Sequence, residues 1–122
     1  MFPRVYQTLT ANATVVAMVG NRIGRHGVIQ QTETRPYITW QIVLGQPYDN
    51  LSSTPCGDFT TVQIDCYCGG VTADADIERL AEAVRAALDA AGVYNRVTVN
   101  NRDPDTRLYR LGIDADFIAQ RA

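Results

Sequence analysis

The chain has 122 residues, of which 46% are hydrophobic and 20% charged, and its formal net charge is −2. This length predicts a single domain, residues 1–122, that buries a core without cross-links, and this composition is typical of neither a disordered nor a fibrous protein. The charge argues against a protein that mainly grips nucleic acid, and no apolar run approaches the roughly 20 residues that a membrane-spanning helix needs.

Residues 3–19 have the spacing of an amphipathic helix. Apolar side chains recur every three to four residues, which favours an amphipathic helix over a signal peptide: Val5, Leu9, Ala13, Val16 and Val19. Asn12 is a good N-cap for a second short helix, which Gly20 would end. We therefore expect either one helix with a break or two short helices.

Two strands are predicted on either side of a polar segment. Alternation places one apolar set on one face of the strand at 36–44 and another on one face of the strand at 59–68: Ile38, Trp40, Ile42 and Leu44, then Val62, Ile64, Cys66 and Cys68. Between them, residues 45–58 are rich in glycine, proline, serine, asparagine and aspartate, which is typical of a long loop. A loop of this length in a small domain is usually functional or mobile.

The clearest predicted element is a helix over residues 72–91. Thr72 is its expected N-cap and Gly92 its expected end, and an apolar stripe faces inward: Ile77, Leu80, Ala81, Val84, Leu88 and Ala91. Strands at 96–101 and 108–120 follow. The order α-β-β-α-β-β predicts an α+β fold. Its N-terminal helix and one long central helix would pack on one face of a mainly antiparallel sheet of four or more strands.

The pair Cys66 and Cys68 raises the question of a metal or redox site. Structural zinc sites usually separate paired cysteines by two to four residues, and redox pairs separate them by two at a helix start. Residues two apart on a strand point the same way, so both cysteines continue the apolar face and are predicted to pack in the core. A metal site would also need Cys56 and His26 from two separate loops. We expect no metal and no cofactor; the alternative is a small zinc- or thiol-dependent enzyme built on these four residues.

No catalytic constellation is apparent, so we do not expect an enzyme. Asp114 and Asp116 have the spacing of a carboxylate pair, but a solvated or partner-facing strand explains them more simply. Arginines gather near tyrosines and aspartates around the last hairpin: Arg96, Arg102, Arg107 and Arg110. This mixture suits a mixed-charge subunit contact better than a nucleic-acid-binding module, which stays the alternative.

Four stretches, in this order, resemble the small tail-completion proteins of long-tailed bacteriophages and prophages, which have a tail-terminator or tail-to-head joining role. They are VVAMVGNRI, PYITWQIV, FTTVQIDCYCGG and DIERLAEAVRAAL, and the similarity covers roughly residues 5–119. Two positions depart from the family pattern. Asn12 replaces an aspartate expected before the second short helix, and Tyr67 lies between two cysteines where an aromatic residue often ends the central strand.

The resemblance implies a virion structural protein that forms a ring, commonly a hexamer, on the end of the tail tube. The partners would be other copies of itself, the tail tube protein and the head connector or neck proteins, with no membrane and no specific nucleic acid. Assembly would take place in the cytoplasm of the host bacterium. We expect contacts from the 45–58 loop and the last hairpin: Tyr48, Asp49, Asn50, Arg102, Asp103, Arg107 and Arg110. Another neck component, a head-completion adaptor or a stopper, is the alternative within this class.

Overall fold

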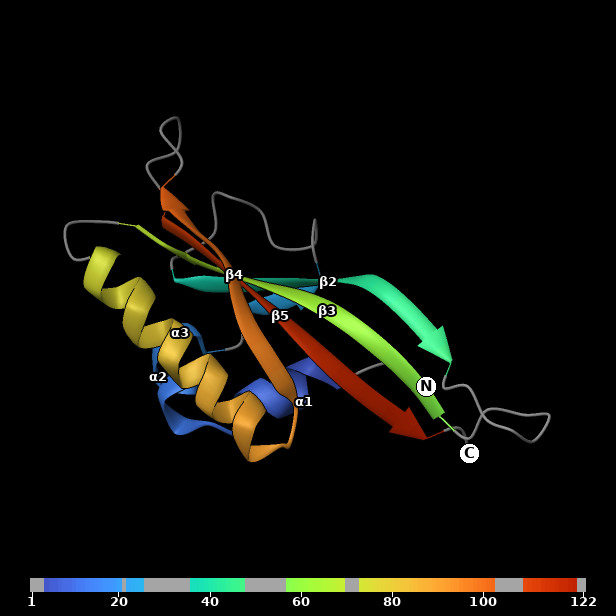
Figure 1. Ribbon diagram of the computed structural model, residues 1–122. Coiled ribbons are helices and arrows are strands. Elements are labelled where there is room, and N and C mark those ends of the chain that lie inside the picture. Colours follow the sequence, from blue (N-terminus) through green and yellow to red (C-terminus); the bar gives the residue numbers. More distant parts are fainter. Residues whose placement is uncertain are drawn as a thin grey trace.

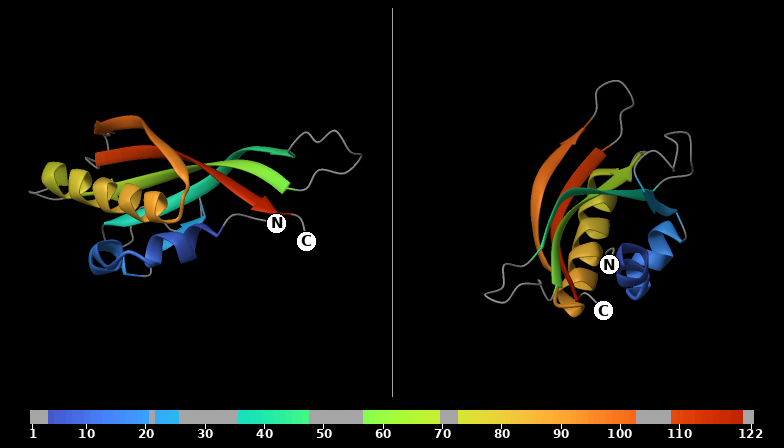
Figure 2. Two further views of the ribbon diagram at one scale, coloured as in Figure 1. Left: turned by 60° about the horizontal axis from the view of Figure 1, so that its bottom comes forward. Right: turned by 90° about the vertical axis from the view of Figure 1, so that its right-hand side faces the viewer.

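The computed structural model describes residues 4–20, 22–25, 36–47, 57–69, 73–102 and 109–120. Its elements are, in order, α1 (Val5–Thr10), α2 (Ala13–Val19), β1 (Ile23–Arg25), β2 (Tyr37–Pro47), β3 (Gly57–Cys68), α3 (Ala73–Ala90), β4 (Tyr94–Arg102) and β5 (Tyr109–Gln120). The strands form one sheet in the order β1-β2-β3-β5-β4, and these helices lie on one face of it (Figure 1, Figure 2). The predicted α+β class is therefore confirmed. No helix within the described residues is long and apolar enough to cross a membrane.

The strand β1 is absent from the predicted order α-β-β-α-β-β, which treats this segment as a loop. It pairs in parallel with β2, with Ile23 opposite Ile38, and it forms one edge of a five-stranded sheet. The pairings β2–β3, β3–β5 and β4–β5 are antiparallel. Three residues are too few to show an alternating pattern, so this strand can be recognised only from its pairing with β2.

The N-terminal segment forms two short helices, which is one of the two predicted arrangements. The predicted apolar face is correct at Val5, Leu9 and Val19 but wrong at Ala13 and Val16, which are exposed, and Val15 is buried instead, because the break at Asn12 starts a new helix with its own phase. The side chain of Asn12 accepts hydrogen bonds from the backbone N–H groups of Thr14 and Val15, at 2.9 and 3.2 Å, and so caps α2. Gly20 ends α2 with a φ of 59°, a conformation that glycine adopts without steric cost. Arg22 then donates to the carbonyls of Met18 and Pro36, at 3.1 and 3.0 Å. This arginine ties the end of α2 to the start of β2.

The strands β2 and β3 extend further than the sequence predicts. Residues 45–47 pair with residues 58–60, so the predicted 45–58 loop is wrong at both ends, and residues 48–56 lie outside the described part of the chain. The register shifts between Ile42 and Leu44, where the predicted alternation of this strand also ends. Glycine and proline have low strand propensity, but here pairing with β3, itself paired with β5, overrides that local preference.

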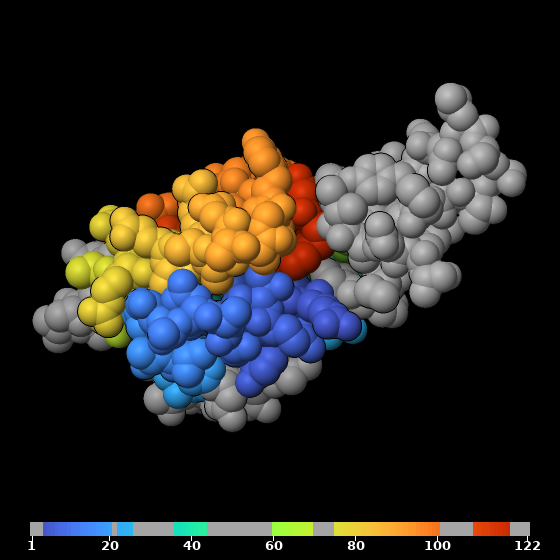
Figure 3. Space-filling view, turned by 90° about the horizontal axis from the view of Figure 1, so that it is seen from below, coloured from blue at the N-terminus to red at the C-terminus, as the bar shows by residue number. Residues whose placement is uncertain are grey.

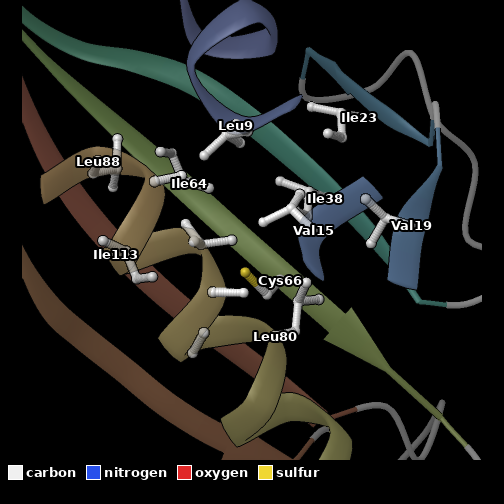
Figure 4. Packing of buried hydrophobic residues seen from close by; sticks show 14 of the residues in the cluster. Leu9, Val15, Val19, Ile23, Ile38, Ile64, Cys66, Leu80, Leu88 and Ile113 are labelled. Atoms are coloured by element: carbon white, nitrogen blue, oxygen red, sulfur yellow. The ribbon is translucent and has the colours of Figure 1, made fainter. Parts of the chain in front are cut away.

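The core lies between the helices and the sheet (Figure 4). Leu80, Val84 and Leu88 of α3 are fully buried, and with them Leu9 of α1 and Val15 of α2. The predicted inward stripe of α3 is correct except at Ala91, which is exposed because the helix ends at Ala90. Ala83 and Ala87 are buried as well. Small side chains at these positions let α3 approach the sheet closely.

Candidate functional site

Cys66 and Cys68 lie in the core, as the alternation of β3 predicts. Cys66 is fully buried and Cys68 is 2% exposed, and both thiols are free (Figure 4 labels Cys66). Burial raises the pKa of the Cys66 thiol, with smaller contributions from Cys68 and Asp65, and burial raises the pKa of Cys68 to about 12. Both thiols belong to the hydrophobic core cluster, where they pack as small apolar groups.

The other two members of the predicted Cys₃His set, Cys56 and His26, lie outside the described residues. Within the part of the chain that the structure describes, no three histidine, cysteine, aspartate or glutamate side chains gather closely enough to hold a metal ion. Polar and charged side chains of the described residues gather on the sheet face that the helices leave free.

A chain of polar side chains crosses the helix-free face. Gln41 donates to Gln63 at 3.2 Å, and Gln63 donates to Asp65 at 3.4 Å. The Arg110 guanidinium donates through Nη2 to both oxygens of Asp65, at 3.3 and 3.4 Å. The Asp65 side chain is only 2% exposed, whereas that of Arg110 is 36% exposed. This ion pair joins β3 to β5 across the face.

Gly112 of β5 makes room for this buried carboxylate. A Cβ atom at this position would lie 3.1 Å from Oδ1 of Asp65 and 3.3 Å from Cβ of Val99. Beside the ion pair, the rings of Tyr37 and Tyr67 stack with centroids 4.8 Å apart. Burial, and then the negative charge of Asp65, raises the pKa of Tyr67, so its hydroxyl stays neutral. The face is therefore closely packed although the helices lie on the other side of the sheet.

Asp114 and Asp116, the predicted carboxylate pair, share one arginine. Arg96 lies 3.6 Å from Oδ2 of Asp114 and 3.4 Å from Oδ2 of Asp116. Thr61 donates its hydroxyl to Oδ1 of Asp116 at 2.9 Å. Two carboxylates with one guanidinium leave this group with a net negative charge. The arrangement is one of ion pairing at the β4 side of the sheet, and it explains both aspartates without an acid–base role.

The strand β4 ends the sheet on that side, and its side chains are largely exposed. Tyr94 is 68% exposed and Val97 43% exposed, and Asn95 is the buried exception at 8%. The Asn95 side chain accepts from Nε of Arg85 and donates to Asp89, both at 2.8 Å, so it fastens β4 to α3. Apart from Asn95 and the half-buried Val99, the side chains of residues 94–100 are exposed.

Charge is divided between two halves of the molecule. The described residues from Arg4 to the end of β2 at Pro47 hold three arginines, Arg4, Arg22 and Arg25, and no acidic residue. Helix α3 alone holds five acidic residues against two arginines. The N-terminal helices and α3 lie side by side on the helix-covered face (Figure 3). One half is therefore basic and the other is acidic.

Of the seven predicted contact residues, only Arg110 has a described side chain, and it pairs with Asp65. Arg102 ends β4 opposite Tyr109. The others lie outside the described residues: Tyr48, Asp49, Asn50, Asp103 and Arg107. Sequence reasoning missed the basic half and the contact between Arg25 and Trp40, whose ring centroid lies 4.9 Å from the guanidinium. The signal was available, since no acidic residue precedes Glu33.

The family model described as "Tail completion protein gp17" matches residues 3–119. No curated protein sequence matches. Two solved structures share the fold. A chain from a virion of a native gene transfer agent particle has a TM-score of 0.72 and 19% identity over 96% of this chain and 92% of that one. Bacteriophage SPP1 gp17 has a TM-score of 0.53 and 16% identity over 97% of this chain and 88% of its own.

Proposed function

This chain belongs to the tail completion protein gp17 family, and we propose that it completes the phage tail by capping the tail tube as a ring. The family match over residues 3–119 is the observation that carries the proposal, and it confirms the resemblance seen in the sequence. Membership makes the protein a structural component of the virion tail and indicates a non-enzymatic role. The finer proposal is a hexameric ring, built from one domain per subunit in the host cytoplasm, that joins the tube to the head connector.

Ring closure is the physical basis of the proposed capping. A head-to-tail interface whose rotation closes gives a ring, so the subunits saturate one another and add no further layer to the tube. The division of charge supports such an interface, because a basic half on one copy is complementary to an acidic half on the next. Two identical halves placed together would instead oppose like charges.

The described strands that precede the two groups of proposed contact residues, β2 and β4, end at opposite ends of the sheet. Pro47 pairs with Asp58 near one end, where the segment holding Tyr48, Asp49 and Asn50 begins. Arg102 pairs with Tyr109 near the other end, where the segment holding Asp103 and Arg107 begins. We propose that one group contacts the tail tube and the other, with Arg110, contacts the head connector. A subunit with contacts at both ends is suited to joining two structures.

Deleting the gene tests this function through particle morphology. We expect tails of uncontrolled length and DNA-filled heads without attached tails in electron micrographs, with rescue by the wild-type gene supplied in trans. Heads that leak DNA would instead identify a stopper or another neck component. Normal infectious particles from the deletion would end the proposal.

Complementation of the deletion with a cysteine variant distinguishes the assembly role from a thiol- or zinc-dependent enzyme. The double variant Cys66→Ala and Cys68→Ala retains the fold's other contacts and is expected to rescue the deletion, because these thiols only pack. Failure of this variant to rescue, together with stoichiometric zinc in the purified wild-type protein, would favour the enzyme alternative.

A further inference from the structure

The helices α1 and α2 present an outward surface without charge. Residues 5–21 contain no charged residue, although 20% of the whole chain is charged. Tyr6 and Val16 are each 43% exposed, and they are two of the five large hydrophobic residues that are exposed within the described part of the chain. The other exposed side chains of this surface, which we call the α1–α2 surface, are small or neutral: Gln7, Ala11, Ala13, Thr14 and Ala17. Water-facing helices normally carry charged residues opposite their apolar stripe.

Helix α3 is the natural comparison, because it lies beside α1 and α2 on the same face of the sheet (Figure 3). Its exposed side chains include five charged ones: Glu78, Arg79, Glu82, Arg85 and Asp89. This helix therefore has the surface expected of a helix that faces water. Depletion of charged residues is instead typical of the buried centre of a protein–protein contact. The α1–α2 surface has the composition of such a contact.

The polar side chains of α1 and of the turn after it form their hydrogen bonds within the chain. The hydroxyl of Thr8 donates to the carbonyl of Arg4, and that of Thr10 to the carbonyl of Tyr6, each at 2.7 Å. The side-chain oxygen of Asn12 accepts from the two backbone N–H groups that it caps. Because these groups already have partners, a protein that covers them need not supply hydrogen bonds of its own.

We propose that the α1–α2 surface binds an uncharged, apolar surface of a different protein of the virion tail. The chemistry of this partner follows from charge, because a charged side chain buried against the α1–α2 surface would lose its water and meet no opposite charge. This inference rests on the proposed function, which brings other tail proteins into contact with the ring.

A second copy of this chain fits the α1–α2 surface less well. The described surfaces of α3, β4 and the helix-free face carry charged side chains, such as Glu82, Arg96 and Asp114. A contact of the α1–α2 surface with itself would be two-fold, and a two-fold contact closes a dimer and not a ring.

Charges of both signs on the α1–α2 surface test the proposal. Thr14→Glu places a negative charge in the first turn of α2, and Ala17→Arg places a positive charge in its last turn. The helix dipole favours both changes and both positions are exposed, so each variant should fold. Each variant gene is supplied in trans to a deletion strain. We expect each to lower the yield of infectious particles at least about tenfold, because an uncharged partner accommodates neither sign.

The matched control is Ala86→Arg, which introduces arginine at an exposed alanine of α3. It should leave the yield unchanged, because α3 already carries charged side chains on its outward side. Circular dichroism of each purified variant verifies that it folds. Loss of yield with Thr14→Glu but not with Ala17→Arg, or the reverse, would indicate a charged partner and overturn the proposed chemistry.

Photo-crosslinking in assembled particles identifies the occupant. A benzophenone amino acid replaces Val16, and mass spectrometry identifies the covalent adducts separated on denaturing gels. We expect an adduct between this chain and a different tail protein, and no such adduct when the same amino acid replaces Ala86. An adduct between two copies of this chain would overturn the choice of partner.

The outcomes distinguish this inference from the proposed function. Wild-type yields from both Thr14→Glu and Ala17→Arg, in particles whose micrographs show a ring on the tube, would overturn the docking surface and leave the capping function standing. Normal infectious particles from the gene deletion would overturn both, since no tail protein would then depend on this chain.

Discussion

The two faces of the sheet are buried by different means, and adjacent residues of β3 show the difference. Cys66 is fully buried because helices pack against its face. Asp65, on the other face, is 2% exposed although the helices lie across the sheet, and side chains of neighbouring strands surround it. Arg110 forms an ion pair with the Asp65 carboxylate, and the missing side chain of Gly112 leaves space for that carboxylate. A polar face can thus be packed closely by its own ladder of side chains.

Because of this contrast, substitutions on the two faces should differ in their effect on the free energy of unfolding. The helix-covered face loses apolar contacts when a side chain is shortened, so its variants are costly. The helix-free face and the edges hold charges that are mostly paired and partly solvated, so their variants are milder and depend on charge. The following changes separate the two faces, from the largest expected effect to the smallest.

Leu80→Ala should cause the largest loss, because Leu80 is fully buried between α3 and the sheet. Deleting a buried leucine side chain costs about 3 kcal/mol of unfolding free energy, through lost burial and the cavity left behind. Urea denaturation measures it, with the exposed Glu82→Ala on the same helix as the matched control, expected within about 0.5 kcal/mol of wild type. If Leu80→Ala lowered the unfolding free energy by less than Glu82→Ala does, α3 would not pack against the sheet as described.

Arg110→Met should destabilise the protein by about 2 kcal/mol, because it removes the guanidinium from the buried Asp65 carboxylate. The figure is below that for a fully buried pair, since the Arg110 side chain is 36% exposed. Adding Asp65→Asn to this variant should recover part of the loss, as a double-mutant cycle would measure. Additive losses in the cycle would contradict the ion pair.

Unfolding free energy should fall as pH rises above about 9. The pKa of the Cys68 thiol is raised from 9.0 to about 12 and that of Cys66 is raised further, so the folded state keeps protons that the unfolded chain releases. Each thiol contributes stability that is complete below pH 9 and declines by up to about 1.4 kcal/mol per pH unit above it. Urea denaturation across this range should give a flatter profile for the double variant Cys66→Ala and Cys68→Ala. If the unfolding free energy of wild type and of the double variant changed equally with pH above 9, both thiols would be exposed to solvent.

Arg96→Ala should cost less than about 1 kcal/mol, because the Arg96 side chain is 46% exposed and its ion pairs are screened by water. The cost should shrink further in about 1 M salt, whereas that of Leu80→Ala should persist. Arg79→Ala on the exposed side of α3 is the matched control. A loss near that of Leu80→Ala would show that the helix-free face carries as much stability as the core.

Much of the covered face was predictable because its signals are local. The two-residue period of β3 places both cysteines in the core, and the spacing of leucines and alanines places α3 over them. Asn12 and Gly20 mark the bounds of α2 through contacts with residues two to four positions away. Of the candidate site, the sequence identified Arg96, Asp114 and Asp116 as one mixed-charge region, but not which groups bind each other.

The sequence by itself therefore determined the helices, the long strands, the inward side of α3, β3 and β5, and the family. It did not determine the inward side of α2, where Val15 is buried and the predicted Val16 is 43% exposed. Only the tertiary structure decided that β1 is a strand, that β2 and β3 continue through glycine and proline, and that Asp65 is buried against Arg110. The reason is distance along the chain. Periodicity and capping depend on near neighbours, whereas Asp65 and Arg110 are 45 positions apart and meet only when β3 and β5 pair.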